Sequence, residues 1–224
     1  MPPVAAEPAA APPKPSSASE TAAMPETAAS EQPRLWRMPI ERYHQMIDAG
    51  VLGTDDRLEL IDGLLVEKMP KSPLHSHLKR LLQHLLTEQC GAAAFVLSED
   101  PITLAGSNSE PEPDLAVVRG ALADYATSHP TGADVALAVE IAVTSLAKDH
   151  TLAAIYAAGG VASYLIVDAA AKTLRLHTEP SPDGYGRIEM VETLPVTVDG
   201  QTVATIERAS LFSSPSEPSD RGDG

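Results

Sequence analysis

Cysteine is almost absent from this 224-residue chain, in which Cys90 is the one thiol. A single cysteine excludes an internal disulfide, and no Cys/His spacing of the kind that binds zinc is present. The lack of disulfides agrees with a reducing compartment. We expect Cys90 to pack in a helix as a small apolar side chain.

The chain also lacks an apolar run of the roughly 18 residues that a membrane-spanning helix requires. Its first ten residues, MPPVAAEPAA, have neither the basic start nor the apolar stretch of a secretory signal. These absences predict a soluble, cytoplasmic protein with no membrane association.

Positive charge is scarce, since 16 Lys and Arg residues stand against 31 Asp and Glu residues and give a formal net charge of −15. This balance disfavours generic binding of nucleic acid through a basic surface. One small basic cluster could meet phosphate groups, and it consists of Lys68, Lys71, Lys79 and Arg80. A solvated helix face with its preceding loop explains the same cluster equally well.

Large apolar side chains are rare at both ends of the chain. Residues 1–34 are rich in Pro and Ala, and residues 213–224 are rich in Ser and Pro. Neither segment can bury enough surface to offset the entropy lost on ordering. We therefore predict two disordered tails around a single domain at residues 35–212, which is long enough to bury a core.

Within that domain the sequence predicts more strands than helices. Apolar residues at helical spacing indicate helices near residues 39–50, 72–90 and 149–158. Asp62-Gly63, between two short apolar runs, predicts an antiparallel hairpin. Further strands are predicted at residues 95–97, 102–104, 115–118 and 135–143 and in SYLIVD, TLRLHT, RIEMVE and TVATIE. Because the helices do not alternate regularly with the strands, the expected class is α+β.

Two acidic residues occur where apolar strands begin or continue. Pro113 favours an extended entry into the strand at 115–118, so Asp114 should lie at its start. The alternative is an ordinary turn aspartate. Glu140 interrupts an apolar run typical of a covered central strand, where a carboxylate is costly unless it is paired with a basic side chain or bound to a metal.

Together, two carboxylates at adjacent strand ends predict a metal site. With water and a backbone carbonyl they offer the oxygen ligands that Mg²⁺ (or Mn²⁺) prefers. On the helix at 72–90, His75 falls near Leu82 at the edge of the apolar stripe and is the histidine best placed to face such a site. Simple packing at the edge of the core is the alternative for His75.

The order of these motifs resembles the Uma family of restriction endonucleases, within the PD-(D/E)XK nuclease superfamily. The resemblance covers roughly residues 36–207 and rests on RLELIDGLLVEKM, SPLHSHLKRLLQHLL, DPITL, SEPEPDLAVVRG, VEIAVTSLAKDH, IYAAGGVASYLIVD and the last strands. It implies a restriction-endonuclease-like core, in which helices flank a mixed central sheet with extra antiparallel hairpins. It also implies a metal-dependent endonuclease acting on DNA. By analogy with nucleases that cut both strands, a homodimer is one expected assembly.

The resemblance also implies roles for individual residues. Pro113-Asp114 matches the PD element and Glu140 the following acid, and both would bind the metal together with Glu59. His75 matches a histidine that opens the second helix and would complete the shell of the site. Asp149 would cap a helix or orient the site.

The superfamily lysine has no obvious counterpart. Directly after Glu140 it would fall at Ala142, and in this family it is usually displaced into the next helix, where DHTLAAIY contains no lysine. Lys148 is the local replacement and would orient the attacking water. The missing lysine also supports an alternative, a non-catalytic interaction module that keeps the nuclease fold. Hydrolysis built on Thr144 or Ser145 is disfavoured, because no nucleophile-elbow glycines flank them.

Overall fold

The computed structural model describes residues 35–143 and 146–212, with side chains for all of these except Thr54 and residues 146–150. Every element described below lies between Ile40 and Phe212. Both predicted tails, at 1–34 and 213–224, lie outside the described residues, so their disorder stays a prediction.

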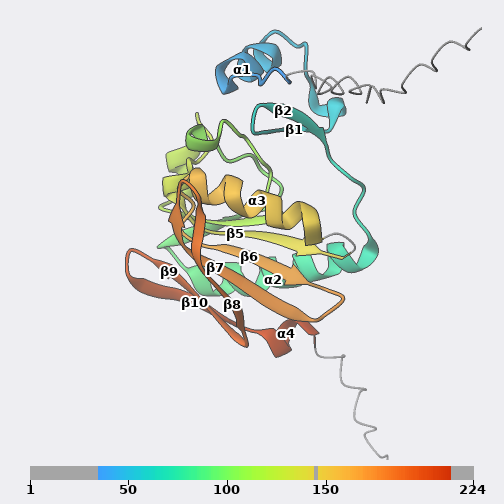
Figure 1. Ribbon diagram of the computed structural model, residues 1–224. Helices are drawn as coiled ribbons and strands as arrows, with labels where there is room; N and C mark the ends of the chain where they lie inside the picture. Colours follow the sequence, from blue (N-terminus) through green and yellow to red (C-terminus); the bar gives the residue numbers. More distant parts are fainter. Residues whose placement is uncertain (1–34, 144–145, 213–224) are drawn as a thin grey trace, which may run out of the picture. The chain divides into compact units, whose positions relative to one another are not determined.

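A six-stranded mixed sheet forms the centre of the domain, with the strand order β3-β4-β5-β6-β7-β8 (Figure 1). Its strands are β3 (Ala94–Leu97), β4 (Leu115–Arg119), β5 (Val135–Ala142), β6 (Tyr164–Asp168), β7 (Thr173–Ser181) and β8 (Gly184–Val191). Neighbouring strands are antiparallel except β5 and β6. That parallel pair needs a crossover connection, which helix α3 (Leu146–Ala158) provides.

Helices α2 (Pro73–Cys90) and α3 cover opposite faces of this sheet (Figure 1). Alternate residues of β4, β5 and β6 belong to two separate apolar clusters, as the two-residue period of a strand requires. Leu78, Leu82 and Leu86 of α2 enter one cluster, whereas Leu152 and Tyr156 of α3 enter the other. The sheet is therefore covered on both sides, which explains the continuous apolar run in β5. None of the helices in the described ranges combines the length and apolar character that crossing a bilayer requires.

Two hairpins and two short helices complete the domain. The hairpins are β1 (Leu58–Ile61) with β2 (Leu64–Glu67), and β9 (Thr193–Val198) with β10 (Gln201–Glu207); the helices are α1 (Ile40–Asp48) and α4 (Arg208–Phe212). In the first hairpin Asp62 and Gly63 both have positive φ, 48° and 71°, as the predicted turn requires. Hairpin β9–β10 packs its apolar side chains into the same cluster as α2.

The α+β class, the mixed sheet flanked by helices and the extra hairpins are confirmed. The strand predicted at 102–104 is wrong. Thr103 and Leu104 make only isolated bridges, and a turn of 3₁₀ helix follows at Ala105–Ser107. Ile102 and Leu104 are nevertheless completely buried. Their apolar side chains therefore indicate burial within a loop and not a strand. Helix α3 begins at Leu146, three residues before its predicted start.

Candidate active site

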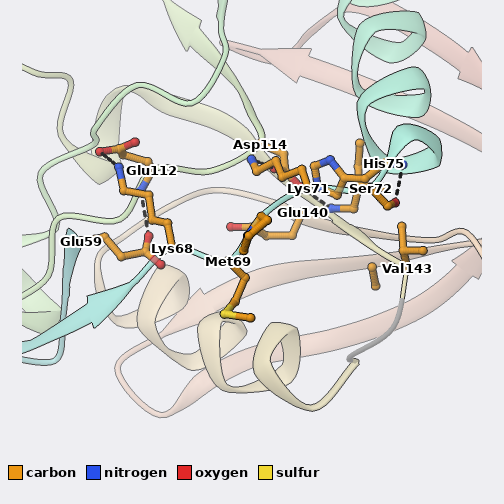
Figure 2. Close-up of a pocket in the computed structure, with 13 residues that line it drawn as sticks. Glu59, Lys68, Met69, Lys71, Ser72, His75, Glu112, Asp114, Glu140 and Val143 are labelled. Carbon is orange, nitrogen blue, oxygen red and sulfur yellow. Dashed lines mark hydrogen bonds and ion pairs between the residues drawn. The ribbon is translucent and has the colours of Figure 1, made fainter. Parts of the chain in front are cut away.

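A cavity of about 500 Å³ is lined by residues of β1, of β5, of the start of α2 and of the segments that precede α2 and β4 (Figure 2). Its wall carries three carboxylates, which belong to Glu59, Asp114 and Glu140. Lys71 and His75 line the same cavity. Four of the five residues predicted for the site therefore lie around one space, and Lys71 joins them.

The register of β4 and β5 brings Asp114 and Glu140 together. These strands are antiparallel, and Leu115 pairs with Val139 while Ala116 pairs with Ala138. One further step along both strands places Asp114, immediately before β4, beside Glu140. Directly opposed residues of an antiparallel pair share one face of the sheet. The two residues thus lie close together at the start of β4, and both line the cavity.

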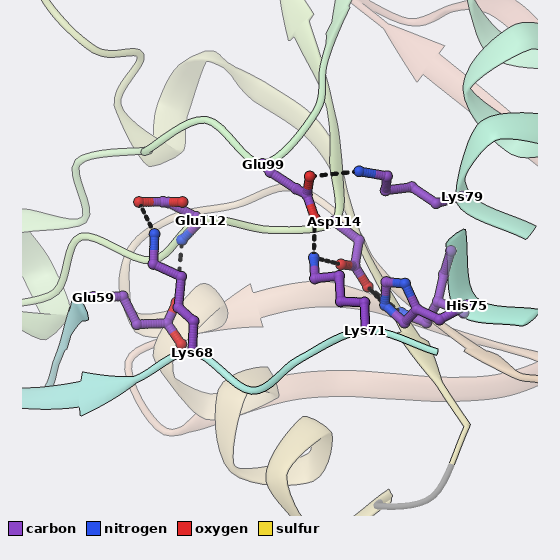
Figure 3. Close-up of polar contacts among 9 residues, drawn as sticks. Glu59, Lys68, Lys71, His75, Lys79, Glu99, Glu112 and Asp114 are labelled. Carbon is purple, nitrogen blue, oxygen red and sulfur yellow. Dashed lines mark hydrogen bonds and ion pairs between the residues drawn. The ribbon is translucent and has the colours of Figure 1, made fainter. Parts of the chain in front are cut away.

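Asp114 is almost completely buried, since its side chain is only 4% exposed. One carboxylate oxygen, Oδ2, accepts hydrogen bonds from His75 Nε2 at 2.9 Å and from the backbone N–H of Ile141 at 2.8 Å. The other, Oδ1, accepts from Lys71 Nζ at 2.5 Å (Figure 3). Burial alone would raise the pKa of Asp114, but the His75 hydrogen bond and the Lys71 charge outweigh it and lower that pKa. Asp114 is therefore kept as a carboxylate.

His75 owes its position to the way α2 begins. Ser72 caps the helix by accepting the backbone N–H of His75 at 3.2 Å, and Pro73 occupies the first turn. The first turn then directs the His75 ring toward Asp114 (Figure 2). In the described part of the chain the other ring nitrogen, Nδ1, is buried without a hydrogen-bond partner. The capping motif visible in the sequence thus delivers the histidine to the carboxylate.

Glu140 is partly buried and accepts a hydrogen bond from the hydroxyl of Tyr156 at 3.0 Å. Tyr156 lies on α3 and is completely buried. Burial raises the pKa of Tyr156 well above its ordinary value, and the negative charge of Glu140 raises it further. The phenol therefore keeps its proton and donates a hydrogen bond to one oxygen of Glu140 from the side of the sheet that α3 covers.

Glu59 approaches the cavity from the hairpin β1–β2. Its side chain is 5% exposed, and its Oε2 accepts the backbone N–H of Glu112 at 3.3 Å. Glu112 in turn forms an ion pair with Lys68 (Figure 3). These contacts connect the β1–β2 hairpin to the segment before β4, which contains Glu112 and Asp114.

Lys71 is the site residue that sequence reasoning did not single out. Its ammonium contacts both Asp114 and Glu99, and Lys79 Nζ lies 2.6 Å from the other oxygen of Glu99 (Figure 3). Lys71 directly precedes the capping Ser72, so the start of α2 brings it to Asp114 together with His75. The sequence signal for this position is its proximity to the cap, whereas charge alone assigns Lys71 to the basic cluster with Lys68, Lys79 and Arg80.

The Glu99 contacts predict a pH-dependent contribution to stability. Burial would raise the pKa of Glu99, but the hydrogen bonds and charges of Lys71 and Lys79 lower it below 4.5. Stability from a depressed pKa is present above the unfolded-state value and is lost as the pH falls through the folded-state value. Glu99→Gln should therefore lower the free energy of unfolding at neutral pH, by at most about 1 kcal/mol because the pairs are partly exposed.

Urea unfolding of both proteins at several pH values measures this contribution. The difference between wild type and Glu99→Gln should be complete above pH 4.5 and should vanish in stronger acid. A difference that stayed constant into strong acid would contradict the ion-pair origin.

The donor set fits a divalent cation in its chemistry, because three carboxylates and the backbone of Ile141 offer oxygen ligands around one cavity. Within residues 35–143 and 146–212, no three His, Cys, Asp or Glu side chains lie close enough together to hold a metal ion as they stand. Since Lys71 contacts Asp114, a bound cation would share that carboxylate with the ammonium or displace it.

The predicted role of Lys148 is not tested by the structure. Lys148 lies in the first turn of α3, and its side chain is outside the described part of the chain, as is that of Asp149. Thr144 and Ser145 lie outside the described residues altogether.

The covered mixed sheet, with a carboxylate pair at the junction of β4 and β5, is similar to a nuclease fold. A crystal structure titled "a putative nuclease belonging to DUF820", from Anabaena variabilis, matches with a TM-score of 0.61 and 15% sequence identity. The match covers 79% of this chain and 98% of that one, and at this identity it shows the fold alone. No curated protein matches the sequence.

The sequence itself defines the family. The model of the Uma2 family, described as "Putative restriction endonuclease", matches residues 40–208. The chain belongs to this family, as the order of motifs in the sequence predicted. Restriction-endonuclease-like proteins generally use divalent metals and act on nucleic acid.

Proposed function

We propose that the protein is a metal-dependent endonuclease that hydrolyses phosphodiester bonds in DNA. The observation that carries this proposal is that Asp114, immediately before β4, and Glu140 of the adjacent strand β5 line one cavity that solvent can enter, together with Glu59. Membership of the Uma2 family supports the nuclease class independently.

In this proposal Asp114, Glu140 and Glu59 hold Mg²⁺ (or Mn²⁺). The bound ion would lower the pKa of a water molecule and stabilise negative charge on the scissile phosphate. It would also reverse the acidic potential of the cavity locally, which a chain of net charge −15 needs in order to admit DNA.

The protein's own groups would hold this arrangement rigid. His75 and the Ile141 N–H fix one oxygen of Asp114, and the Tyr156 hydroxyl fixes one oxygen of Glu140. His75 would complete the shell of the site, and Lys148, in the first turn of α3, is one candidate for orienting the attacking water. Carboxylates that are already oriented lose little freedom when they bind a cation.

The test is incubation of purified protein with supercoiled plasmid and with single-stranded DNA. Each substrate is offered with Mg²⁺, with Mn²⁺ and with chelator, beside an Asp114→Ala control. Nicking that requires the metal and disappears in the control is the expected result. Because a homodimer would allow both strands to be cut, light scattering of the same sample should accompany the assay.

The alternative is a non-catalytic interaction module that retains the nuclease fold. Ala142 at the position of the superfamily lysine favours it, as does the acidic charge. Folded protein that binds metal but cleaves neither substrate would support this alternative and contradict the endonuclease. A bound cation alone would not distinguish the two.

Tyr156→Phe should lower metal affinity and cleavage by about tenfold, because removal of a group that orients a metal ligand typically costs 10–100-fold. The variant keeps the buried ring and loses only the hydroxyl that donates to Glu140. Mn²⁺ titration by calorimetry measures the affinity, and thermal unfolding checks that the fold is intact. Unchanged affinity would mean that Tyr156 only packs.

A further inference from the structure

Lys71 lies in the cavity that also contains Ala142, the position where the superfamily would place its lysine. The two residues come from different elements, since Lys71 precedes α2 and Ala142 ends β5. The ammonium of Lys71 is 2.5 Å from Asp114 Oδ1. The lysine that is missing from β5 at Ala142 is thus matched by Lys71, which lines the same cavity but comes from the segment before α2.

We infer that Lys71 replaces the missing superfamily lysine, and that its ammonium orients the attacking water and stabilises the charge that develops on the phosphate. This inference rests on the proposed endonuclease function. In the step, the water oxygen bonds to phosphorus and the ester P–O bond breaks with its electron pair on the departing oxygen. The water releases a proton to solvent, the departing oxygen takes one from solvent, and Lys71 keeps its own throughout.

The contacts of Lys71 suit this role better than a purely structural one. Its side chain is 32% exposed and lines the cavity, so solvent and a phosphate can approach it there. Glu99 contacts the same ammonium and limits its movement. Asp114 already has two donors in His75 and the Ile141 N–H, so its burial does not depend on Lys71 alone.

The first test compares Lys71→Met with wild type in cleavage and in Mn²⁺ binding. Cleavage at saturating Mg²⁺ should fall by about 10²-fold, the effect of removing one group that stabilises developing charge. Mn²⁺ affinity should stay equal or increase, since the metal no longer competes with an ammonium for Asp114. Arg187→Met removes one positive charge from β8, at an exposed side chain that does not line the cavity, and should retain full cleavage.

Chemical rescue separates charge from packing. Cys90 is buried, and burial raises the pKa of its thiol, so a thiol introduced by Lys71→Cys should react selectively with alkylating reagents. Alkylation with 2-bromoethylamine restores an ammonium of nearly the original length, whereas iodoacetamide adds a neutral group. Only bromoethylamine should restore cleavage, to about tenfold or more above the rate of the untreated Lys71→Cys protein.

Each outcome decides between the inference and the proposed function. Wild-type protein that cleaves no DNA overturns both. Cleavage by wild type and Lys71→Met alike overturns the role of Lys71 and leaves the endonuclease intact. Loss of cleavage only in Lys148→Met assigns the ammonium to Lys148 instead. Loss of both cleavage and Mn²⁺ binding in Lys71→Met would show a structural role.

Discussion

Replacing Asp114 with Asn should reduce metal-dependent DNA cleavage by at least about 10²–10³-fold, the range seen when one charge-stabilising group is removed from a catalytic site. The amide has nearly the volume of the carboxylate but cannot carry its negative charge. It also replaces one acceptor oxygen with a donor NH₂, although all three present partners of Asp114 are donors. At least one of these donors must therefore lose its partner.

The same substitution should destabilise the protein by about 1–3 kcal/mol, the cost of leaving a buried polar group unsatisfied. Single-turnover cleavage assays give the rate, and urea unfolding gives the stability. Assays far below the unfolding midpoint ensure that the loss of rate is not a loss of folded protein. Cleavage within threefold of wild type would remove Asp114 from the catalytic site.

Glu140→Gln should weaken Mn²⁺ binding and cleavage by about 10²-fold while the fold stays intact. The amide oxygen can still accept the hydroxyl of Tyr156, so the buried phenol keeps its hydrogen bond. Loss of the negative charge removes a ligand that a hard cation prefers. Because Glu140 lies within an apolar central strand, replacing it with a neutral group should not lower stability.

Calorimetric Mn²⁺ titration of Glu140→Gln, beside Tyr156→Phe, tests this argument. The two variants change opposite ends of one hydrogen bond, and the carboxylate variant should lose more affinity. An equal loss in both would show that the orientation of Glu140, rather than its charge, determines binding. Full affinity in Glu140→Gln would place the metal elsewhere.

Much of the site could be predicted because its signals are local. The Pro113-Asp114 pair, the lone Glu140 in an apolar strand and the capped start of α2 are each visible within a few residues. The pairing of β4 with β5 could not be predicted in the same way. Periodicity tells which face a side chain occupies, but it does not give the partner strand or the register.

Lys71 shows the same limit. Its contact with Asp114 joins residues 43 positions apart, and its charge is equally compatible with an exposed loop. The prediction of a strand at 102–104 is wrong for a related reason. Apolar residues buried in a loop resemble a short strand when only their polarity is considered.

The hydrogen bond from the Ile141 amide to Asp114 gives the protein an internal spectroscopic probe. A backbone amide bonded to a carboxylate has a proton resonance that responds to the charge and position of that carboxylate. The Ile141 signal in an NMR spectrum would therefore shift when a cation, an ammonium or a phosphate changes the environment of Asp114. Ligands could be followed at this one nucleus without any label on the substrate, and without any turnover.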